Sequence, residues 1–257
     1  MIHELRLFFI ALQFLTRLPV PRCVGFEAAW LNQSARHFPA VGLCVGGVAA
    51  VVLWAGHLLL APDVAVGLSM AATLLLTGCF HEDGWADTCD GLGGRVSRER
   101  ALEIMKDSRI GAYGAIGLVL MLGLKAATLV ALPFAWAVPA TLFAHTASRA
   151  AAVVLIRLLP YAGDVEHAKA KPLAQRVSAA GVVVALGWVV VVAAGLWLWN
   201  PASAQALVTS AVLVAAGAAW FVRWLRQRLG GTTGDTLGAA QQLTELLALL
   251  GWLAATR

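Results

Sequence analysis

Four carboxylates stand close together in the segment 80–91, FHEDGWADTCDG: Glu82, Asp83, Asp87 and Asp90. In a helix, Asp83, Asp87 and Asp90 would occupy positions i, i+4 and i+7 and share one face, within an arc of about 60°. Like charges on one helix face repel each other, so a cation is expected to bind there. Carboxylate oxygens suit a hard divalent ion, and Mg²⁺ completes its shell with water and substrate phosphate. We therefore predict that the three aspartates jointly bind one or two Mg²⁺ ions.

A second segment, ALEIMKDSRIGAYG at 101–114, combines basic residues with an amphipathic pattern. Ser97 is expected to cap a short helix whose apolar face lies on the membrane surface. Lys106, Asp107 and Arg109 would then gather at its end, where the two cations could clamp a pyrophosphate. The alternative is an interfacial helix that makes ordinary contacts with lipid headgroups.

Glycines and threonines open a third segment, GGTTGDTLGAAQQLTE at 230–245. Backbone N–H groups that enter a helix attract anions, which makes this loop a candidate phosphate cradle around Gly234 and Asp235. It is not a P-loop, because it lacks the Gly-Lys-Ser/Thr ending.

Ionisable side chains also occur inside apolar segments. Glu245 lies within the last of these segments, and Arg149 lies in another, one turn after His145. Charged groups at membrane depth are functional candidates by default, although a purely structural pair of Arg149 and Glu245 is the competing interpretation. Lys125 is expected near the outer end of its helix, extending its amine toward water.

The composition places the chain in a membrane. It is 60% hydrophobic and only 13% charged, with a mean hydropathy of +0.78, which is outside the range of soluble domains. A helix needs about 20 apolar residues to cross a bilayer. We predict an all-α polytopic bundle with about seven crossings, at 38–61, 64–81, 110–132, 134–156, 177–199, 203–225 and 236–255. The shorter apolar run within 1–21 ends at two prolines and is predicted to be an interfacial helix.

The connecting segments alternate in charge. Lys and Arg cluster before the first predicted crossing and after the second, fourth and sixth, whereas the other turns contain neither residue. The positive-inside rule therefore predicts that the basic segments, and the candidate site with them, face the cytoplasm of a cell inner membrane. The predicted organisation is one integral membrane domain, 1–257, with an interfacial segment 1–21, cytoplasmic loops 82–109 and 157–176, and a glycine-rich loop 226–235.

This topology explains the pI of about 9.4 without a nucleic-acid partner. The four cysteines show no paired spacing and are interpreted as small buried residues. Cys79, His81 and Cys89 could hold a soft metal, but the surrounding carboxylates and the lack of a fourth conventional ligand disfavour zinc. A homo-oligomer is compatible with the sequence.

Four ordered motifs carry a resemblance that spans nearly the whole chain: FLTRLPVP, TGCFHEDGWADTCDGL, EIMKDSRIGAYG and LGGTTGDTLGA. With them the chain resembles the cobalamin synthase family, the adenosylcobinamide-GDP ribazoletransferases. The resemblance implies a multi-spanning, Mg²⁺-dependent membrane enzyme. In the implied reaction a hydroxyl of α-ribazole, or of its phosphate, attacks the phosphorus on the corrinoid side of adenosylcobinamide-GDP, and GMP leaves.

The resemblance also implies site residues. The family's motifs fall on His81, Asp83, Asp87 and Asp90, on Lys106, Asp107, Ser108 and Arg109, and on Gly234 and Asp235. Metal ligands would be the three aspartates, with Glu82 ranked lower. Lys106 and Arg109 would neutralise charge on the departing GMP, with Arg149 as a further candidate, and Glu245 joins the substrate-binding set. Asp90 or His81 would accept the hydroxyl proton.

Two other functions compete with this one. A CDP-alcohol phosphotransferase performs the same displacement, but its motif has an Ala-Arg pair where this chain has Ala86-Asp87. A cation-coupled transporter could use Asp83, Arg149 and Glu245 as gating charges. Transporters place their sites near the midplane, often between internal repeats, and the sequence has no such repeat.

Overall fold

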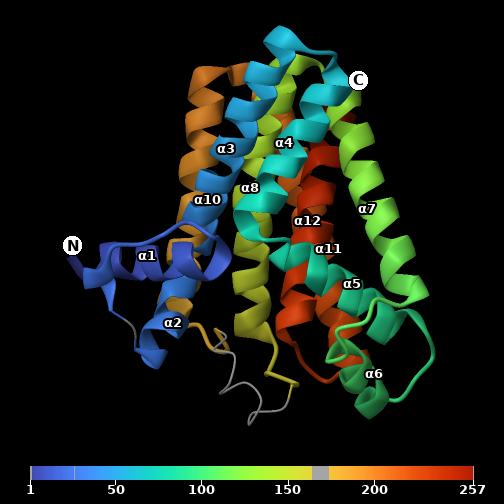
Figure 1. Cartoon of the computed structure of the whole chain (residues 1–257). Helices are drawn as coiled ribbons and strands as arrows, with labels where there is room; N and C mark the ends of the chain where they lie inside the picture. Colours follow the sequence, from blue (N-terminus) through green and yellow to red (C-terminus); the bar gives the residue numbers. More distant parts are fainter. Residues whose placement is uncertain (1, 26, 164–173, 257) are drawn as a thin grey trace.

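The computed structural model describes residues 2–25, 27–163 and 174–256, and these form a bundle of helices without a β-strand. The long helices are α3 (Phe38–Leu59), α7 (Ala112–Ala131), α8 (Phe134–Leu158), α10 (Ala179–Trp199), α11 (Ala204–Arg228) and α12 (Gly234–Ala255). The shorter ones are α1 (Ile2–Leu15), α2 (Ala28–Ser34), α4 (Pro62–Thr77), α5 (Phe80–Gly93) and α6 (Arg98–Met105), with 3-10 turns η1 (Arg22–Val24), η2 (Ala35–His37) and η3 (Pro201–Ser203). Figure 1 shows α8 and α12 at the centre of the bundle. The predicted all-α fold is confirmed.

Among the described residues, five helices are long and apolar enough to cross a membrane, and a sixth span is counted if α4 and α5 are taken as one bent span. The predicted number of seven is therefore approximate. The helix predicted at 236–255 exists as α12, but Gln241, Gln242 and Glu245 make it too polar to be counted with the apolar spans. These side chains are buried by neighbouring helices, so α12 is sheltered from lipid.

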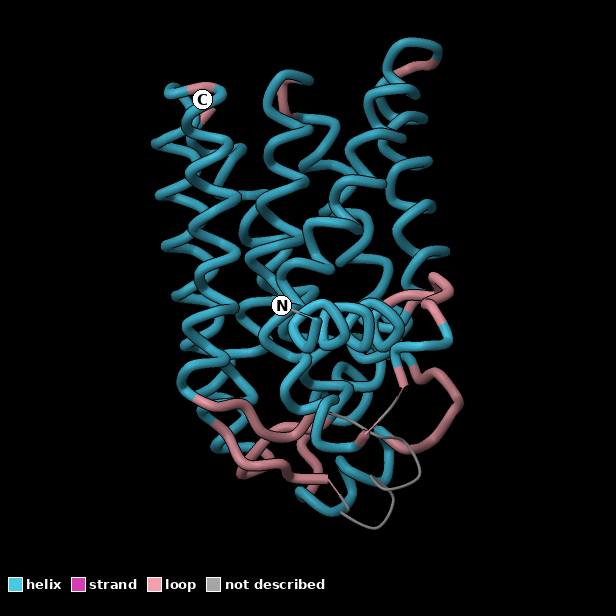
Figure 2. Tube along the Cα trace, turned by 90° about the vertical axis from the view of Figure 1, so that its left-hand side faces the viewer, coloured by secondary structure: helices cyan, strands magenta, loops and turns pink. Residues whose placement is uncertain are grey.

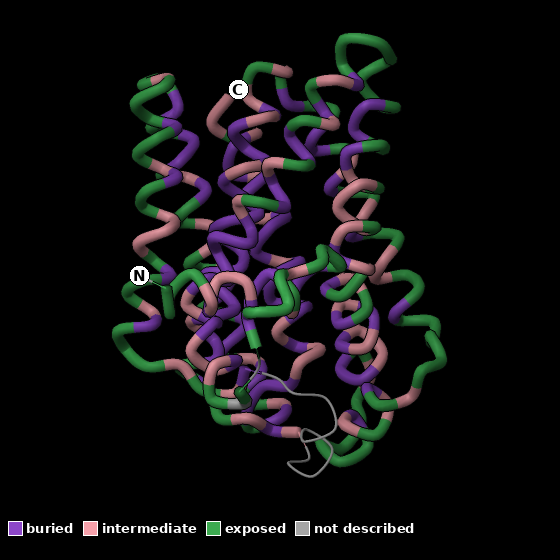
Figure 3. Tube along the Cα trace, turned by 60° about the vertical axis from the view of Figure 1, so that its left-hand side comes forward, coloured by how far each residue is buried: buried purple, intermediate pink, exposed green. Residues whose placement is uncertain are grey.

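Large apolar side chains are exposed on the outer helices, as expected for contact with lipid tails. Val119 on α7, Val190 on α10 and Val208 on α11 are examples. Figure 3 shows the buried residues concentrated along the inner helices and the exposed ones along the periphery. The arrangement is that of a multi-pass membrane protein.

The N-terminal helix α1 lies across the direction of the long helices (Figures 1 and 2). Its residues Leu7 and Ile10 are buried with Val24 and Leu31, and Leu15 is buried against α3 of the bundle. Glu4, one turn before Leu7, pairs with Arg36 at 3.2 Å and with His37 at 2.9 Å. This placement agrees with the predicted interfacial helix.

The connections divide between the two ends of the bundle. The turns α3–α4, α7–α8 and α10–α11, which lack Lys and Arg, lie together at one end in Figure 1. The opposite end, called the basic end below, carries α6, the segment that joins α11 to α12, and the described residues 159–163 and 174–178 that follow α8 and precede α10. Lys169, Lys171 and most of the predicted 157–176 loop lie outside the described residues. The described basic segments therefore gather at one end, as the charge pattern predicts.

The predicted crossing 64–81 is wrong in one respect that affects the site. Its helix ends at Thr77, and the next helix, α5, is bent away from it by 89°. Gly78 and Cys79 both adopt left-handed conformations, with φ of 68° and 59°, and this turns the chain through about a right angle. The acidic segment is therefore a separate helix and not a straight continuation of α4. The predicted 82–109 loop is likewise mostly helical, because it contains α5 and α6.

Candidate active site

The acidic helix α5 crosses the beginning of α12 at very close range. A Cβ atom on Gly84 would lie 2.7 Å from the carbonyl oxygen of Asp235, and one on Gly238 would lie 3.2 Å from that of His81. Only glycine permits this approach of two helix backbones. The contact brings the acidic motif and the glycine-rich motif together, although about 150 residues separate them in the chain.

The aspartates of α5 do not all face the same space. Asp83 is exposed and Asp87 is half-buried. Asp90 instead accepts hydrogen bonds from the backbone N–H groups of Gly111 and Gly114, each at 2.8 Å. These amides belong to the first turn of α7, whose N-terminus favours a negative charge. Asp90 therefore fastens α7 to α5.

The joint three-aspartate metal site stays a prediction, and both carboxylate oxygens of Asp90 already accept amide hydrogens. In the part of the chain that the structure describes, no three His, Cys, Asp or Glu side chains are placed to hold a metal ion. The same finding removes the soft-metal alternative at Cys79, His81 and Cys89. Asp83 and Asp87 are left as two hard oxygen ligands on adjacent turns of α5, a set that fits Mg²⁺ with water and phosphate as its other ligands.

Asp90 gives a testable prediction. We expect Asp90→Ala to lower the unfolding free energy by about 1–2 kcal/mol, because two amides at the start of α7 lose their acceptor. Asp90→Asn keeps one carbonyl acceptor and should lose less. Denaturant unfolding of the purified variants measures both. Equal stability of all three proteins would contradict the anchoring role, and normal turnover of Asp90→Asn would exclude Asp90 as the base.

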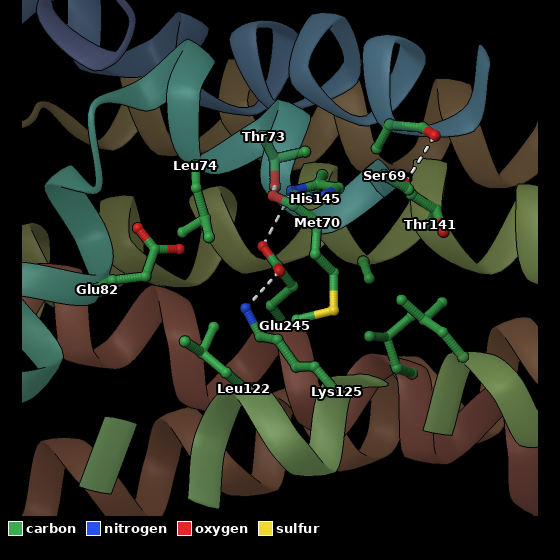
Figure 4. A pocket seen from close by; sticks show the side chains of 14 residues that line it. Ser69, Met70, Thr73, Leu74, Glu82, Leu122, Lys125, Thr141, His145 and Glu245 are labelled. Atoms are coloured by element: carbon green, nitrogen blue, oxygen red, sulfur yellow. Dashed lines mark hydrogen bonds and ion pairs between the residues drawn. The ribbon is translucent and has the colours of Figure 1, made fainter. Parts of the chain in front are cut away.

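Glu82 points away from these aspartates and into the bundle. Its Oε1 accepts a hydrogen bond from Nε2 of Gln242 at 2.8 Å, while its buried Oε2 has no partner among the described residues. It lines an internal pocket with Lys125, His145 and Glu245, shown in Figure 4. The structure does not place Glu82 with Asp83 and Asp87 as a metal ligand.

Glu245 is the centre of a buried charge cluster (Figure 4). Its Oε1 lies 2.6 Å from Nζ of Lys125, and its Oε2 lies 3.0 Å from Nδ1 of His145 and 3.9 Å from a guanidinium nitrogen of Arg149. Gln241 also donates a short hydrogen bond to it. The predicted pairing of Arg149 and Glu245 is thus the longest of these contacts.

The expectation for Lys125 is wrong. Its side chain is only 5% exposed and donates to Gln242 as well as to Glu245. Sequence reasoning missed this residue because it considered one helix at a time. The signal was present, since a lysine inside a membrane span is itself a reason to look for a buried partner.

The second predicted segment has the expected helix but a different packing. Oγ of Ser97 accepts the N–H of Arg100 at 3.2 Å, so the predicted cap of α6 is confirmed. The apolar face of α6 does not lie on a membrane surface. Ala101 and Met105 are buried in the protein, with Met105 close to Gly91 of α5. This contact positions the turn after α6 beside the C-terminal end of α5.

In that turn, Asp107 and Arg109 bind each other. Arg109 donates from Nε to Asp107 at 3.0 Å and from a terminal nitrogen at 2.6 Å. These side-chain hydrogen bonds lower the pKa of Asp107 to about 2, so the pair stays ionised at neutral pH. Arg109 is 86% exposed, and Lys106 and Ser108 are exposed too. The predicted clamp is therefore at the surface, with part of the Arg109 charge balanced by Asp107.

The glycine-rich loop forms a capped helix start. Thr233 and Thr236 bond each other's backbone N–H groups at the first turn of α12, which begins at Gly234. Gly230 supplies a left-handed residue, with φ of 71°, and Thr232 pairs with Pro160 and Ala162 through the backbone. The loop is thus held firmly at the basic end, with Asp235 against α5.

The candidate residues therefore fall into two groups along α5. His81, Arg149 and Gly234 line one pocket near the start of α5, and Asp235 packs close by on Gly84. Lys106, Asp107, Ser108 and Arg109 follow α6 near its other end, and Asp83 and Asp87 lie between. The rise of a helix separates His81 from Asp90 by roughly 14 Å. The structure does not bring Arg149 together with Lys106 and Arg109 around one leaving group.

Comparison with known proteins decides the family. The family model for cobalamin-5-phosphate synthase matches residues 7–253. The chain belongs to the cobalamin-5-phosphate synthase family. The resemblance inferred from the four motifs is confirmed, and family membership makes the protein a transferase.

Relatives of known name support this membership across the full length. The chain is 63% identical to the adenosylcobinamide-GDP ribazoletransferase of Leptothrix cholodnii, over 99% of this chain and 97% of that protein. It is 43% identical to the protein of the same name from Vibrio cholerae, over 98% and 95% of the two chains. The protein of that name from Albidiferax ferrireducens is 44% identical, over 96% and 97%. No solved structure matches the chain.

Proposed function

We propose that this chain is an adenosylcobinamide-GDP ribazoletransferase that depends on Mg²⁺. The observation that carries the proposal is the 63% identity, over nearly all of both chains, to a protein of that name. The contact of the acidic helix α5 with the glycine-rich start of α12 supports it, because it unites the two motifs that phosphoryl transfer would need.

The reaction displaces GMP. A hydroxyl oxygen of α-ribazole, or of its phosphate, forms a bond to the phosphorus on the corrinoid side of adenosylcobinamide-GDP. The bond from that phosphorus to the oxygen of GMP breaks, and GMP leaves with the electron pair. The hydroxyl proton passes to a base. Positioning and charge neutralisation are the main contributions that a protein makes to such a displacement.

Each group of residues along α5 has a proposed role in this reaction. Asp83 and Asp87 would hold Mg²⁺, which would supply positive charge to neutralise the pyrophosphate. Lys106 and Arg109, with Asp107 and Ser108 beside them, bind the GMP side. His81 is the better base, because both carboxylate oxygens of Asp90 already accept amide hydrogens. Gly234 and Asp235 position the acceptor side, and the Glu245 cluster holds Arg149 in place.

The proposed setting is a cell inner membrane with the basic end in the cytoplasm. The gathering of the described basic segments at one end of the bundle supports this orientation. Polar, phosphorylated substrates would then reach the site directly from the cytoplasm.

The test is a GMP-release assay with the full-length protein in membranes, supplied with adenosylcobinamide-GDP and α-ribazole. Release should require both substrates, stop on addition of EDTA and return with Mg²⁺. Release of CMP from CDP-diacylglycerol in place of this activity would overturn the proposal, and so would full activity in excess EDTA.

A further inference from the structure

A second pocket opens beside the start of α5, where five helices meet: α1, α3, α5, α8 and α12. One wall is aromatic, formed by Phe14, Phe38 and Phe80. The rings of Phe14 and Phe38 are stacked, with centroids 5.7 Å apart, and Phe80 meets Phe14 edge to face at 5.4 Å. Flat aromatic ligands bind well against the exposed faces and edges of such rings.

The opposite side of this pocket carries a buried cation. Arg149 is 2% exposed and lines the pocket. One of its terminal nitrogens donates to the carbonyl oxygen of His145 at 3.0 Å, but its buried Nε has no hydrogen-bond partner in the part of the chain that the structure describes. A buried donor that belongs to a charged group strongly favours a ligand that accepts its hydrogen.

The start of α12 reinforces this preference for an anion. Gly234, its first residue, also lines the pocket. The N-terminus of this 22-residue helix carries a partial positive charge and directs backbone N–H groups outward. Arg149 and Gly234 thus supply two independent features that favour a phosphate or another electron-rich oxygen group.

Aromatic rings next to an anion site are the chemistry that recognises a nucleoside or nucleotide. The cavity measures about 30 Å³, so the surrounding side chains would have to move apart to admit one. The residues around the three phenylalanines are apolar, among them Leu15, Ile156 and Leu237. Guanine would leave several donors and acceptors of its edge without partners there, which is costly in an apolar slot. A methylated benzimidazole, the base of α-ribazole, presents an apolar edge to the same residues. The chemistry of the wall therefore favours the acceptor over the guanosine of the donor.

The position of the pocket relative to α5 also favours the acceptor as its ligand. Phe80 and His81 belong to the first turn of α5 and line the pocket, and Asp83 follows directly. A nucleoside in the pocket would have its ribose near His81, at the end of α5 opposite to the Lys106–Arg109 turn. An in-line displacement has the attacking and leaving oxygens on opposite sides of the phosphorus, and binding of acceptor and leaving group toward opposite ends of α5 is compatible with it.

We infer that this pocket binds the acceptor, with the benzimidazole base against Phe14, Phe38 and Phe80 and the ribose, or its phosphate, toward Arg149 and Gly234. The inference rests on the proposed function, of which it specifies the second substrate site.

The test separates the two substrates kinetically. In full-length protein reconstituted in nanodiscs, Phe80→Ala should raise the KM for α-ribazole about tenfold, the effect of losing one aromatic stack on a base. The KM for adenosylcobinamide-GDP should change less than twofold. Phe80→Tyr keeps the ring and should restore the KM for α-ribazole. Phe134→Ala is the matched control, because Phe134 stacks on His57 at the other end of the bundle.

A second arm identifies what Arg149 binds. Arg149→Lys keeps a charge but removes the planar donor fork. If the anion site takes a phosphate, the KM for α-ribazole phosphate should rise at least fivefold more than the KM for α-ribazole. Equal rises would overturn the phosphate assignment and leave the ribose as the group bound there.

Three results would overturn the inference. They are an unchanged KM for α-ribazole in Phe80→Ala, a rise only in the KM for adenosylcobinamide-GDP, and a phospholipid that occupies the pocket and is not displaced by α-ribazole. Equilibrium binding of labelled α-ribazole to the wild-type protein, measured without adenosylcobinamide-GDP, distinguishes failure of this inference from failure of the proposed function. Binding that Phe80→Ala weakens, in a protein that releases no GMP, would support the pocket and contradict the reaction.

Discussion

Replacing Asp83 by asparagine is expected to lower the rate of GMP release by about 10²–10³-fold. The asparagine side chain would offer one neutral oxygen in place of a charged carboxylate, which weakens the binding of Mg²⁺ and the charge balance at the pyrophosphate. Stability should stay within about 0.5 kcal/mol of the wild type, because Asp83 is exposed. Initial rates at saturating substrates, with Mg²⁺ varied, measure the effect.

The controls for Asp83→Asn use other carboxylates of the same chain. Asp63→Asn removes an exposed acid in the first turn of α4, at the end of the bundle opposite to the site, and should leave the rate unchanged. Asp87→Asn should resemble Asp83→Asn. The metal-binding role would be excluded if both α5 variants turned over normally at low Mg²⁺ concentration.

Hydropathy predicted the outer helices well because the residues of these helices that face lipid are apolar. Val119, Val190 and Val208 are exposed apolar residues on three such helices, and these spans were predicted within a few residues. Hydropathy also located α12, predicted at 236–255 and observed at 234–255, but it could not show that this helix lies inside the bundle and makes polar contacts there. It also missed the bend before α5. Gly78 was a visible signal for a helix end, but no pattern indicates that Cys79 would adopt a left-handed conformation.

The site was predictable only as far as local spacing reaches. The i, i+4, i+7 pattern correctly placed the aspartates on one helix, yet it could not indicate that amides of α7 would bind Asp90. That contact depends on the packing of two helices. The aromatic pocket was even less predictable from the sequence. Phe14, Phe38 and Phe80 are far apart in the chain, and nothing in their surroundings indicates that they meet.

The cluster around Glu245 leads to the second large expected effect. Lys125→Met should lower the unfolding free energy by about 3–5 kcal/mol, because it leaves Glu245 buried without its closest cation. The remaining partners compensate only in part, since the Arg149 guanidinium is 3.9 Å from the carboxylate and His145 contacts it at 3.0 Å. Unfolding in detergent, followed by helical circular dichroism, measures the loss.

A double variant tests whether the loss arises from the unpaired charge or from lost packing. Lys125→Met combined with Glu245→Gln removes both charges and keeps most of the volume, so a substantial part of the lost stability should return. Arg149 would then lack a carboxylate within 4 Å in the described part of the chain, which would limit the recovery.

The size of the coupling decides between the two interpretations. If the stability losses of Lys125→Met and Glu245→Gln are additive, the two side chains stabilise the bundle independently. We expect a coupling energy of at least about 1 kcal/mol for a pair whose charged atoms lie 2.6 Å apart between α7 and α12. The Glu245 carboxylate also contacts Arg149, so its loss in Glu245→Gln should weaken substrate binding at the neighbouring pocket as well. The same ion pairs would then contribute both to the stability of the bundle and to substrate binding.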